Sequence, residues 1–183
     1  MAALSLNSVN TIRVVTMINL QGQVLILNAS LRMGVGDSFV DNFSAGGVSA
    51  GIDPEAGRLM RYAYDRDWNR YIEHPTTKKV FEDFRVPEWS RIVGTARSIQ
   101  GFFPFYRLLG LDLAIEQNGE PVLIELNGAP DLVGLEQKAG PLLRSEPVLR
   151  AFGEYGLLVN KYQRRLYADL GRAQGRDRDR SGS

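Results

Sequence analysis

Residues 112–130 read DLAIEQNGEPVLIELNGAP, two apolar runs joined by a short polar turn. An Asn-Gly pair between apolar runs is a strong signal for a β-hairpin. In a hairpin, a residue near the start of the first strand lies opposite a residue near the end of the second. We therefore expect Asp112 to lie beside Glu125 and Asn127. Because side chains alternate between the two faces of a strand, Glu125 and Asn127 share one face of the predicted sheet.

These three side chains offer oxygen atoms of the kind that hold a hard metal ion. Two neighbouring carboxylates repel each other unless a cation or a hydrogen-bond donor lies between them. Mg²⁺ accepts carboxylates, an amide oxygen, water and nucleotide phosphates as ligands. The alternative is that all three are solvated hairpin residues, but the apolar strands around them and the LNGAP turn that follows favour a site. The pattern therefore predicts that Asp112, Glu125 and Asn127 bind Mg²⁺ or Mn²⁺.

The rest of the chain predicts an α+β fold, with a mostly antiparallel sheet and flanking helices. Apolar and β-branched runs predict strands at residues 11–17, 23–33, 58–68, 108–117 and 121–127. Helical spacing of apolar residues predicts helices at 87–102, with Pro87 at the first helical position, and at 146–170, with a break near Gly153 or Gly156. The glycine-rich residues 34–57 show little periodicity, and we interpret them as a functional loop.

Composition limits the function classes. The chain has 183 residues, 44% of them hydrophobic, and a net charge of +1, which is typical of one globular domain and does not indicate nucleic-acid or membrane binding. The absence of cysteine and the single histidine, His74, exclude disulfides, thiolate zinc sites and histidine-rich metal sites. No run is apolar enough to span a membrane, so we expect a cytoplasmic protein.

Trp68 and Trp89 are expected to be packing anchors. The polar residues 172–183 are expected to be a disordered tail, which leaves residues 1–171 as the domain.

The residues also resemble a known family. Asp112, followed after twelve residues by Glu-x-Asn in the setting GLDLAI and PVLIELNGAP, resembles the metal-binding hairpin of ATP-grasp enzymes. Upstream, NTIRVVTM, LRMG, DNFSAGGVSAGID, EHPTT and VPEW follow the order and spacing of the α-L-glutamate-ligase-related and sugar-transfer-associated subgroup. The resemblance covers about residues 8 to 143 and implies the C-terminal subdomain of the ATP-grasp fold.

The resemblance implies an ATP-dependent, ADP-forming ligase. Such an enzyme phosphorylates a carboxylate to an acylphosphate, which an amine or another nucleophile then attacks. ATP and Mg²⁺ are the implied cofactors, with the metal on Asp112, Glu125 and Asn127. Arg13 and Arg32 match catalytic positions where a guanidinium faces the γ-phosphate or the acylphosphate. The alternative for both arginines is a solvated strand residue or a structural ion pair.

The loop DNFSAGG matches a stretch that closes over phosphates and acceptor in related ligases. The implied cofactor-binding residues are Asn42, Ser44, Gly46 and Gly47. Backbone amides in such a loop can hold an oxyanion, and glycine permits the close approach that this requires. The alternative is a flexible connection without a binding role.

The resemblance also implies a missing part. A full ATP-grasp enzyme has an upstream lobe with the adenine pocket and phosphate-binding lysines, whereas this chain begins almost at the NTIR strand. We therefore expect the C-terminal half of a ligase, with the N-terminal lobe absent. Its expected partners are a carboxylate substrate, an amine or other nucleophilic acceptor, and either a separate N-terminal lobe or a second copy of the chain. The alternatives are a non-catalytic or truncated remnant that serves as a metal-binding or interaction module, and one subunit of a split ligase.

Overall fold

A computed structural model describes residues 10–36 and 46–181, and the side chains of residues 10–36 and 46–172. The chain divides into two compact units, residues 1–141 and residues 142–183. The predicted boundary, between a domain at 1–171 and a disordered tail at 172–183, stays a prediction.

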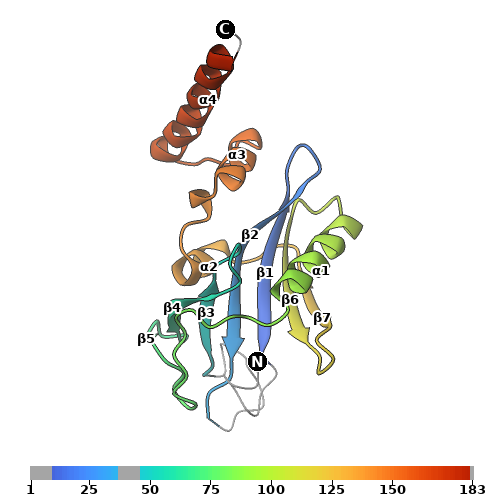
Figure 1. Cartoon of the computed structure of the whole chain (residues 1–183), viewed down its shortest axis with the longest axis vertical. Helices are drawn as coiled ribbons and strands as arrows, with labels where there is room; N and C mark the ends of the chain where they lie inside the picture. Colours follow the sequence, from blue (N-terminus) through green and yellow to red (C-terminus); the bar gives the residue numbers. More distant parts are fainter. Residues whose placement is uncertain (1–9, 37–45, 182–183) are drawn as a thin grey trace. The chain divides into compact units, whose positions relative to one another are not determined.

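The first unit is built on a seven-stranded sheet with the strand order β5-β4-β3-β2-β1-β6-β7 (Figure 1). All neighbouring strands pair antiparallel. The fold is therefore α+β with an antiparallel sheet, as the sequence predicts. The strands are β1 (Thr11–Ile18), β2 (Val24–Met33), β3 (Val48–Ile52), β4 (Leu59–Tyr64), β5 (Arg70–Tyr71), β6 (Leu108–Ile115) and β7 (Pro121–Asn127).

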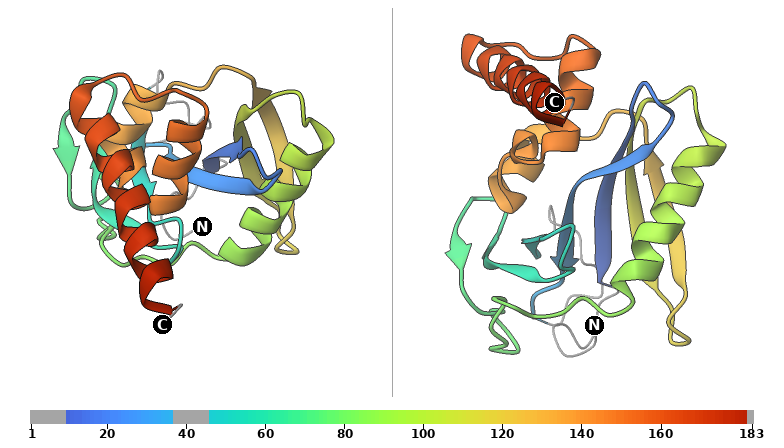
Figure 2. Two further views of the ribbon diagram at one scale, coloured as in Figure 1. Left: turned by 90° about the horizontal axis from the view of Figure 1, so that it is seen from above. Right: turned by 45° about the horizontal axis from the view of Figure 1, so that its top comes forward.

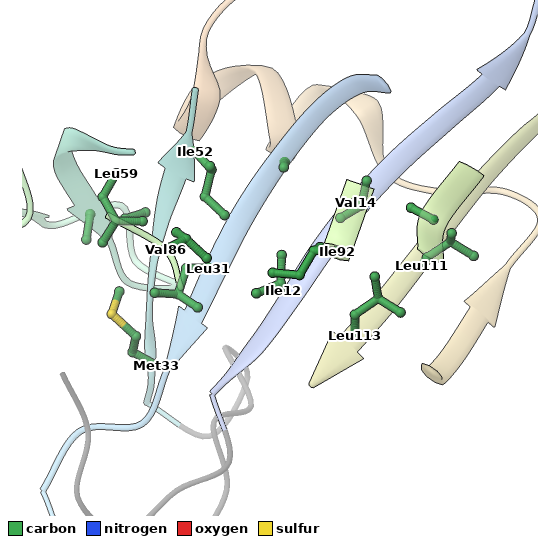
Figure 3. Close-up of a cluster of buried hydrophobic side chains, with 14 of the residues drawn as sticks. Ile12, Val14, Leu31, Met33, Ile52, Leu59, Val86, Ile92, Leu111 and Leu113 are labelled. Atoms are coloured by element: carbon green, nitrogen blue, oxygen red, sulfur yellow. The ribbon is translucent and has the colours of Figure 1, made fainter. Parts of the chain in front are cut away.

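The hydrophobic core lies on the face of the sheet that helix α1 (Trp89–Phe102) covers. Alternate side chains of the central strands point to this face. They pack against one another and against α1, and this packing excludes water. Figure 3 shows the strand side chains around Ile92 of α1. The fully buried members include Ile12, Val14, Leu31, Leu111 and Leu113. The one polar group of β1 on this face is satisfied, because the Thr16 hydroxyl donates to the Gln100 side chain of α1 at 2.7 Å.

Helix α2 (Leu132–Ala139) packs on the opposite face, over β2, β3 and β4 (Figure 2). Its C-terminal end lies directly on Gly51, where a Cβ would come within 2.6 Å of the Cα of Ala139. Gly51 belongs to one row of cross-strand partners that also contains Ser30, Arg13 and Asp112. Partners in a row share a face, so these side chains and α2 lie on the same side, which we call the polar face.

Three elements of the first unit were not expected from the sequence: the two-residue strand β5, strand β3 and helix α2. Strand β3 lies within residues 34–57, which were interpreted as a loop, and α2 follows the second hairpin without a predicted helix. Strand β3 is only VSAGI, with too few large apolar or β-branched residues to give a strand signal. Its small residues are required because α2 packs so closely on Gly51. Helix α2 has a defined start, since Asp131 accepts a hydrogen bond from the backbone N–H of Gly134 at 3.0 Å.

The other boundaries shift by a few residues. Strand β4 ends at Tyr64, and a turn capped by Asp65 separates it from β5. Helix α1 begins at Trp89. The prediction that Pro87 occupies the first helical position is therefore wrong, because Pro87 lies two residues before the helix. The residue between them, Glu88, has a left-handed backbone with φ of 54°, which ends the extended segment before the helix starts.

The second unit consists of a short 3₁₀ helix at Leu142–Arg144, α3 (Glu146–Glu154) and α4 (Lys161–Ser181). The predicted break is confirmed, because α3 ends before Gly156, whose φ of 70° is incompatible with a continuing helix. Helix α4 runs past Leu170, where the sequence pattern placed its end. Residues 182 and 183 of the expected tail lie outside the described residues. In the described part of the chain, no helix combines the length and apolar character that crossing a membrane requires.

Candidate functional site

The two predicted arginines and the predicted aspartate come together on the polar face. Arg13 of β1 is the cross-strand partner of Asp112 of β6. Its Nε and Nη2 atoms donate to the two carboxylate oxygens, the latter over 2.6 Å. Arg32 of β2 adds a third hydrogen bond, from Nη1 to Oδ2 at 3.0 Å. Asp112 is therefore held by a bidentate guanidinium and by a second guanidinium, the geometry in which arginine binds an anion most strongly.

This ion cluster is largely withdrawn from water. The side chain of Asp112 is 5% exposed, that of Arg13 14% and that of Arg32 27%. The hydrogen bond to Asp112 raises the pKa of Arg13 and outweighs the opposing effect of burial, with a further contribution from the charge of Glu125. Arginines of this chain thus neutralise the charge of Asp112, which weakens its repulsion with Glu125 without a metal ion.

Glu125 lies beside the cluster with a different environment. It is the direct cross-strand partner of Asp112, as the hairpin pattern predicts. The register shifts between this pair and the next, Leu113 with Leu123, so Ile124 is the extra residue of a β-bulge. A β-bulge changes the direction in which the neighbouring side chains point. Glu125 is exposed, Ile124 is 58% exposed, and the ion pairs found among the described residues do not include Glu125.

Asn127 ends β7 opposite Gly110, two rows from Glu125 and on the same face of the sheet. Its Oδ1 accepts a hydrogen bond from the backbone N–H of Ala129 at 2.8 Å, which turns the chain at Asn-Gly-Ala-Pro. The turn places Pro130 against Gly110, where an added Cβ would be 2.8 Å from the proline Cβ. Asn127 therefore has a structural role in the turn, while a carbonyl oxygen keeps a second lone pair for a ligand.

The oxygen donors fit a hard divalent cation in kind, but Asp112 is already occupied. In the described residues, no group of three or more histidine, aspartate or glutamate side chains is arranged to hold a metal. A site here would consist of Glu125, one remaining lone pair of Asp112 and the Asn127 oxygen. Arg13 and Arg32 compete with a cation for Asp112, so a metal requires another anion to engage the arginines.

The predicted cofactor-binding loop is described only in part. Asn42 and Ser44 lie outside the described residues. Gly46 and Gly47 immediately precede β3, and Gly46 has a φ of 94° that favours glycine. The cofactor-binding role of Asn42, Ser44, Gly46 and Gly47 stays a prediction.

Two further polar residues of this face were missed by the sequence reasoning, because they lie on the unpredicted elements β3 and α2. Ser49 of β3 is the cross-strand partner of Arg32 and is 1% exposed. Lys138 of α2 places its ammonium group over the ring of Trp68, 5.6 Å from the ring centroid. Burial, together with the charges of Arg32 and Arg13, lowers the pKa of Lys138 to about 8, against the opposing effect of Asp131. A lysine that lies near two arginines indicates an anion-binding site. This grouping becomes evident only in the folded structure.

Of the other singled-out residues, His74 and Trp89 have structural environments. His74 is 1% exposed, and its Nε2 lies 2.9 Å from the backbone oxygen of Gly34. Its Nδ1 accepts backbone N–H groups at Thr76 and Thr77. Trp89 packs against the core, as expected, whereas Trp68 is 43% exposed next to Lys138.

Comparison with known proteins gives a family match. A family model described as sugar-transfer associated ATP-grasp matches residues 1–151, which include every strand of the sheet and both helices that flank it. The searches among curated proteins and among solved structures gave no match. The family match covers most of the chain and agrees with the subgroup that the sequence motifs resemble. The chain belongs to the sugar-transfer associated ATP-grasp family.

Proposed function

We propose that this chain is the C-terminal catalytic portion of an ADP-forming ligase that activates a carboxylate as an acylphosphate. The observation that carries the proposal is the cluster of Arg13, Arg32, Asp112 and Glu125 on one face of the sheet. Phosphoryl transfer needs mainly positioning and charge neutralisation, and this cluster supplies guanidinium donors beside carboxylates. Family membership supports nucleotide binding, and the reaction, ATP and Mg²⁺ are the proposal.

In the proposed reaction, a carboxylate oxygen of the substrate attacks the γ-phosphorus, and ADP leaves with the electrons of the broken P–O bond. An amine or other nucleophile then attacks the acyl carbon, loses its proton and releases inorganic phosphate. Arg13 and Arg32 orient the phosphoryl oxygens and neutralise their charge. Asp112, Glu125 and Asn127 would be the residues that hold a divalent cation once the arginines pair with the phosphoryl group instead of Asp112. Mg²⁺ bound there supplies further neutralisation of the phosphate charge.

Apolar residues beside Glu125 support the nucleotide assignment. Leu123 is 38% exposed and Ile124 is 58% exposed, although both belong to a strand. The bulge at Ile124 places an apolar side chain next to the acidic one. An exposed apolar surface beside a phosphate site suits the flat base of a nucleotide.

The carboxylate substrate and the nucleophilic acceptor are proposed partners, as are a separate N-terminal lobe and a second copy of the chain. A cytoplasmic location is part of the proposal.

The test measures Mg-ATP binding by calorimetry on the wild-type chain, Glu125→Ala and Glu116→Ala. Glu116 is an exposed acid of the same hairpin, at its turn end, and is the matched control. We expect Glu125→Ala to weaken Mg-ATP binding at least tenfold, which corresponds to about 1.4 kcal/mol. Glu116→Ala should bind like the wild type. Equal loss in both variants would contradict the proposed site.

A second candidate function follows from the occupied state of Asp112. Both of its oxygens are taken by arginines of the chain, as in a structural ion-pair cluster, which favours a non-catalytic module that keeps the fold. If the chain alone binds no nucleotide at millimolar ATP, and a polypeptide that carries the nucleotide-binding lobe restores binding, the protein is one subunit of a split ligase. No binding with that lobe present would favour the non-catalytic module.

A further inference from the structure

Lys138 is held rigidly over the polar face by the packing of α2. The helix lies so close to β3 that an added Cβ at Gly51 would be 2.5 Å from the backbone oxygen of Lys138 itself. The next residue, Ala139, is fully buried against the same glycine. The backbone of Lys138 therefore has little freedom to move away from the sheet, and only its side chain can adjust.

The surroundings of Lys138 are unusual for a structural lysine. Its ammonium group lies over the Trp68 ring, and Tyr64 packs against Trp68 with ring centroids 6.0 Å apart. The charges that act on it most strongly come from Arg32, with Arg13 also unfavourable, while Asp131 is the acid that opposes them. Its lowered pKa shows that these neighbours and burial disfavour the charged form. An anion bound between Lys138 and Arg32 would remove this penalty.

Ser49 provides an independent observation at the same place. Its Oγ atom is buried and, within the part of the chain that the structure describes, has no hydrogen-bond partner. Ser49 is the cross-strand partner of both Arg32 and Tyr64, so its side chain lies on the polar face between them. A buried hydroxyl without a partner costs free energy unless a ligand or water satisfies it. The donor is therefore available beside Arg32, on the face of the sheet that α2 covers with Lys138 at its C-terminal end.

The order of the strands separates this place from the proposed metal site. Asp112 is on β6, Arg13 on β1, Arg32 on β2 and Ser49 on β3, and these four strands are consecutive neighbours. Arg32 thus lies between the carboxylate pair on one side and Ser49 with Lys138 on the other. Two anions placed on the two sides of Arg32 would share its guanidinium, which is what a carboxylate attacking a phosphoryl group requires.

We propose that Lys138, Ser49 and Arg32 bind the carboxylate group of the substrate, with Trp68 positioning the lysine. The inference rests on the proposed ligase function and adds where the acid is held. Lys138 and Arg32 pair with the carboxylate oxygens, and the Ser49 hydroxyl donates to one of them. Trp68 and Tyr64, which lie beside the lysine, offer aromatic surface to the rest of the substrate.

The test uses acetate as the probe and lysine labelled with ¹³C at Cε as the reporter. The chain has four lysines, so each signal can be assigned by a single Lys→Gln variant. Acetate at tens of millimolar should shift the Lys138 signal saturably, relative to chloride at the same ionic strength. Lys161 is the matched control, because its ammonium also lies over an aromatic ring, 5.2 Å from the Tyr162 centroid. An equal shift at Lys161, or none at Lys138, would overturn the proposal.

Variants separate binding from a structural role. Ser49→Ala should weaken acetate binding about five- to tenfold and leave the chain folded, because the hydroxyl that it removes has no hydrogen-bond partner among the described residues. Lys138→Gln should abolish saturable acetate binding, measured by calorimetry and by the ¹³C signals of the other three lysines. Lys138→Arg should retain most of the acetate binding. Unchanged acetate affinity in Ser49→Ala and Lys138→Gln would overturn the inference.

Mg-ATP binding to the same proteins distinguishes the two proposals. We expect Ser49→Ala and Lys138→Gln to bind Mg-ATP within about twofold of the wild type, since both lie beyond Arg32 from the metal ligands. If Mg-ATP binds and acetate does not, the carboxylate site is wrong and the ligase proposal stands. If acetate binds at Lys138 and Mg-ATP does not bind even with the nucleotide-binding lobe, the ligase proposal is wrong, and Lys138 marks an anion site of a different function.

Discussion

Replacing Gly51 by alanine tests whether the close contact between β3 and α2 determines the geometry of the polar face. The added Cβ would lie 2.5 Å from the Lys138 backbone oxygen, and 2.6 Å and 2.9 Å from the Cα and Cβ of Ala139. These atoms belong to the backbone or its first carbon, so rotation of a side chain cannot relieve the overlap. Overpacking of this kind costs about 1–3 kcal/mol, and we expect a value near the upper end.

Gly94→Ala is the matched control. Gly94 lies in the middle of α1, and a Cβ there would meet no atom within 4 Å. The same substitution should therefore stabilise the protein by about 1 kcal/mol through the helix propensity of alanine. Because about 1 kcal/mol corresponds to roughly 2–4 °C in a chain of this size, Gly51→Ala should lower Tm by roughly 5–10 °C and Gly94→Ala should raise it slightly.

The assay is urea unfolding at 25 °C followed by circular dichroism, with thermal unfolding as a second measurement. The acetate titration of Lys138 on the folded Gly51→Ala protein reports whether α2 has moved. Reduced stability together with weaker acetate binding is the expected result. A Gly51→Ala protein that is as stable as the wild type within about 0.5 kcal/mol, with normal acetate binding, would refute the close packing of α2 on β3.

Three further predictions concern charged groups. Asp112→Asn should lower the free energy of unfolding by about 2–3 kcal/mol, because it leaves Arg13 and a second guanidinium without their anion, and an unchanged urea midpoint would contradict the buried cluster. Lys138 has a folded pKa of about 8 against 10.5 in the unfolded chain, so the unfolded state binds more protons between these values and stability should rise with pH across this window. After allowance for its partial exposure, the gain is about 1–2 kcal/mol, and Lys138→Gln should remove it in urea unfolding at pH 7.5 and pH 10. Burial lowers the pKa of His74 below its ordinary 6.5, so the unfolded state takes up the proton first and stability should fall as pH drops below that value, a slope that His74→Asn should flatten.

The hairpin of β6 and β7, with Asp112, Glu125 and Asn127 on it, could be predicted from the sequence because the signals for it are local. An Asn-Gly turn between apolar runs determines the pairing, and the structure confirms the register that places Asp112 opposite Glu125. The bulge at Ile124 could not be predicted, because one extra residue leaves the alternation of the strand almost unchanged. The partners of Asp112 were also not evident, since Arg13 is 99 residues away in the chain and only the pairing of β1 with β6 brings the two together.

The other half of the site depends on elements that give no local signal. Strand β3 has five small or medium residues, and α2 has eight residues, a length at which helix formation depends on tertiary packing. The pattern of small residues in β3 has meaning only once α2 is seen to pack on Gly51. Ser49 and Lys138 lie on these two elements. Their proximity to Arg32 is therefore a property of the assembled sheet, and the sequence pattern of either segment alone does not contain it.

If the proposed function is correct, the arginine pair around Asp112 sets the order in which ligands enter. A free divalent ion meets a carboxylate whose oxygens are already bonded to two guanidinium groups, and its own charge is repelled by both. A nucleotide that arrives with its ion brings the phosphates that draw the arginines away, so ion and nucleotide should enter as one complex. The protein without nucleotide would then bind little free magnesium, and its occupancy would follow the concentration of the complex between the ion and the nucleotide.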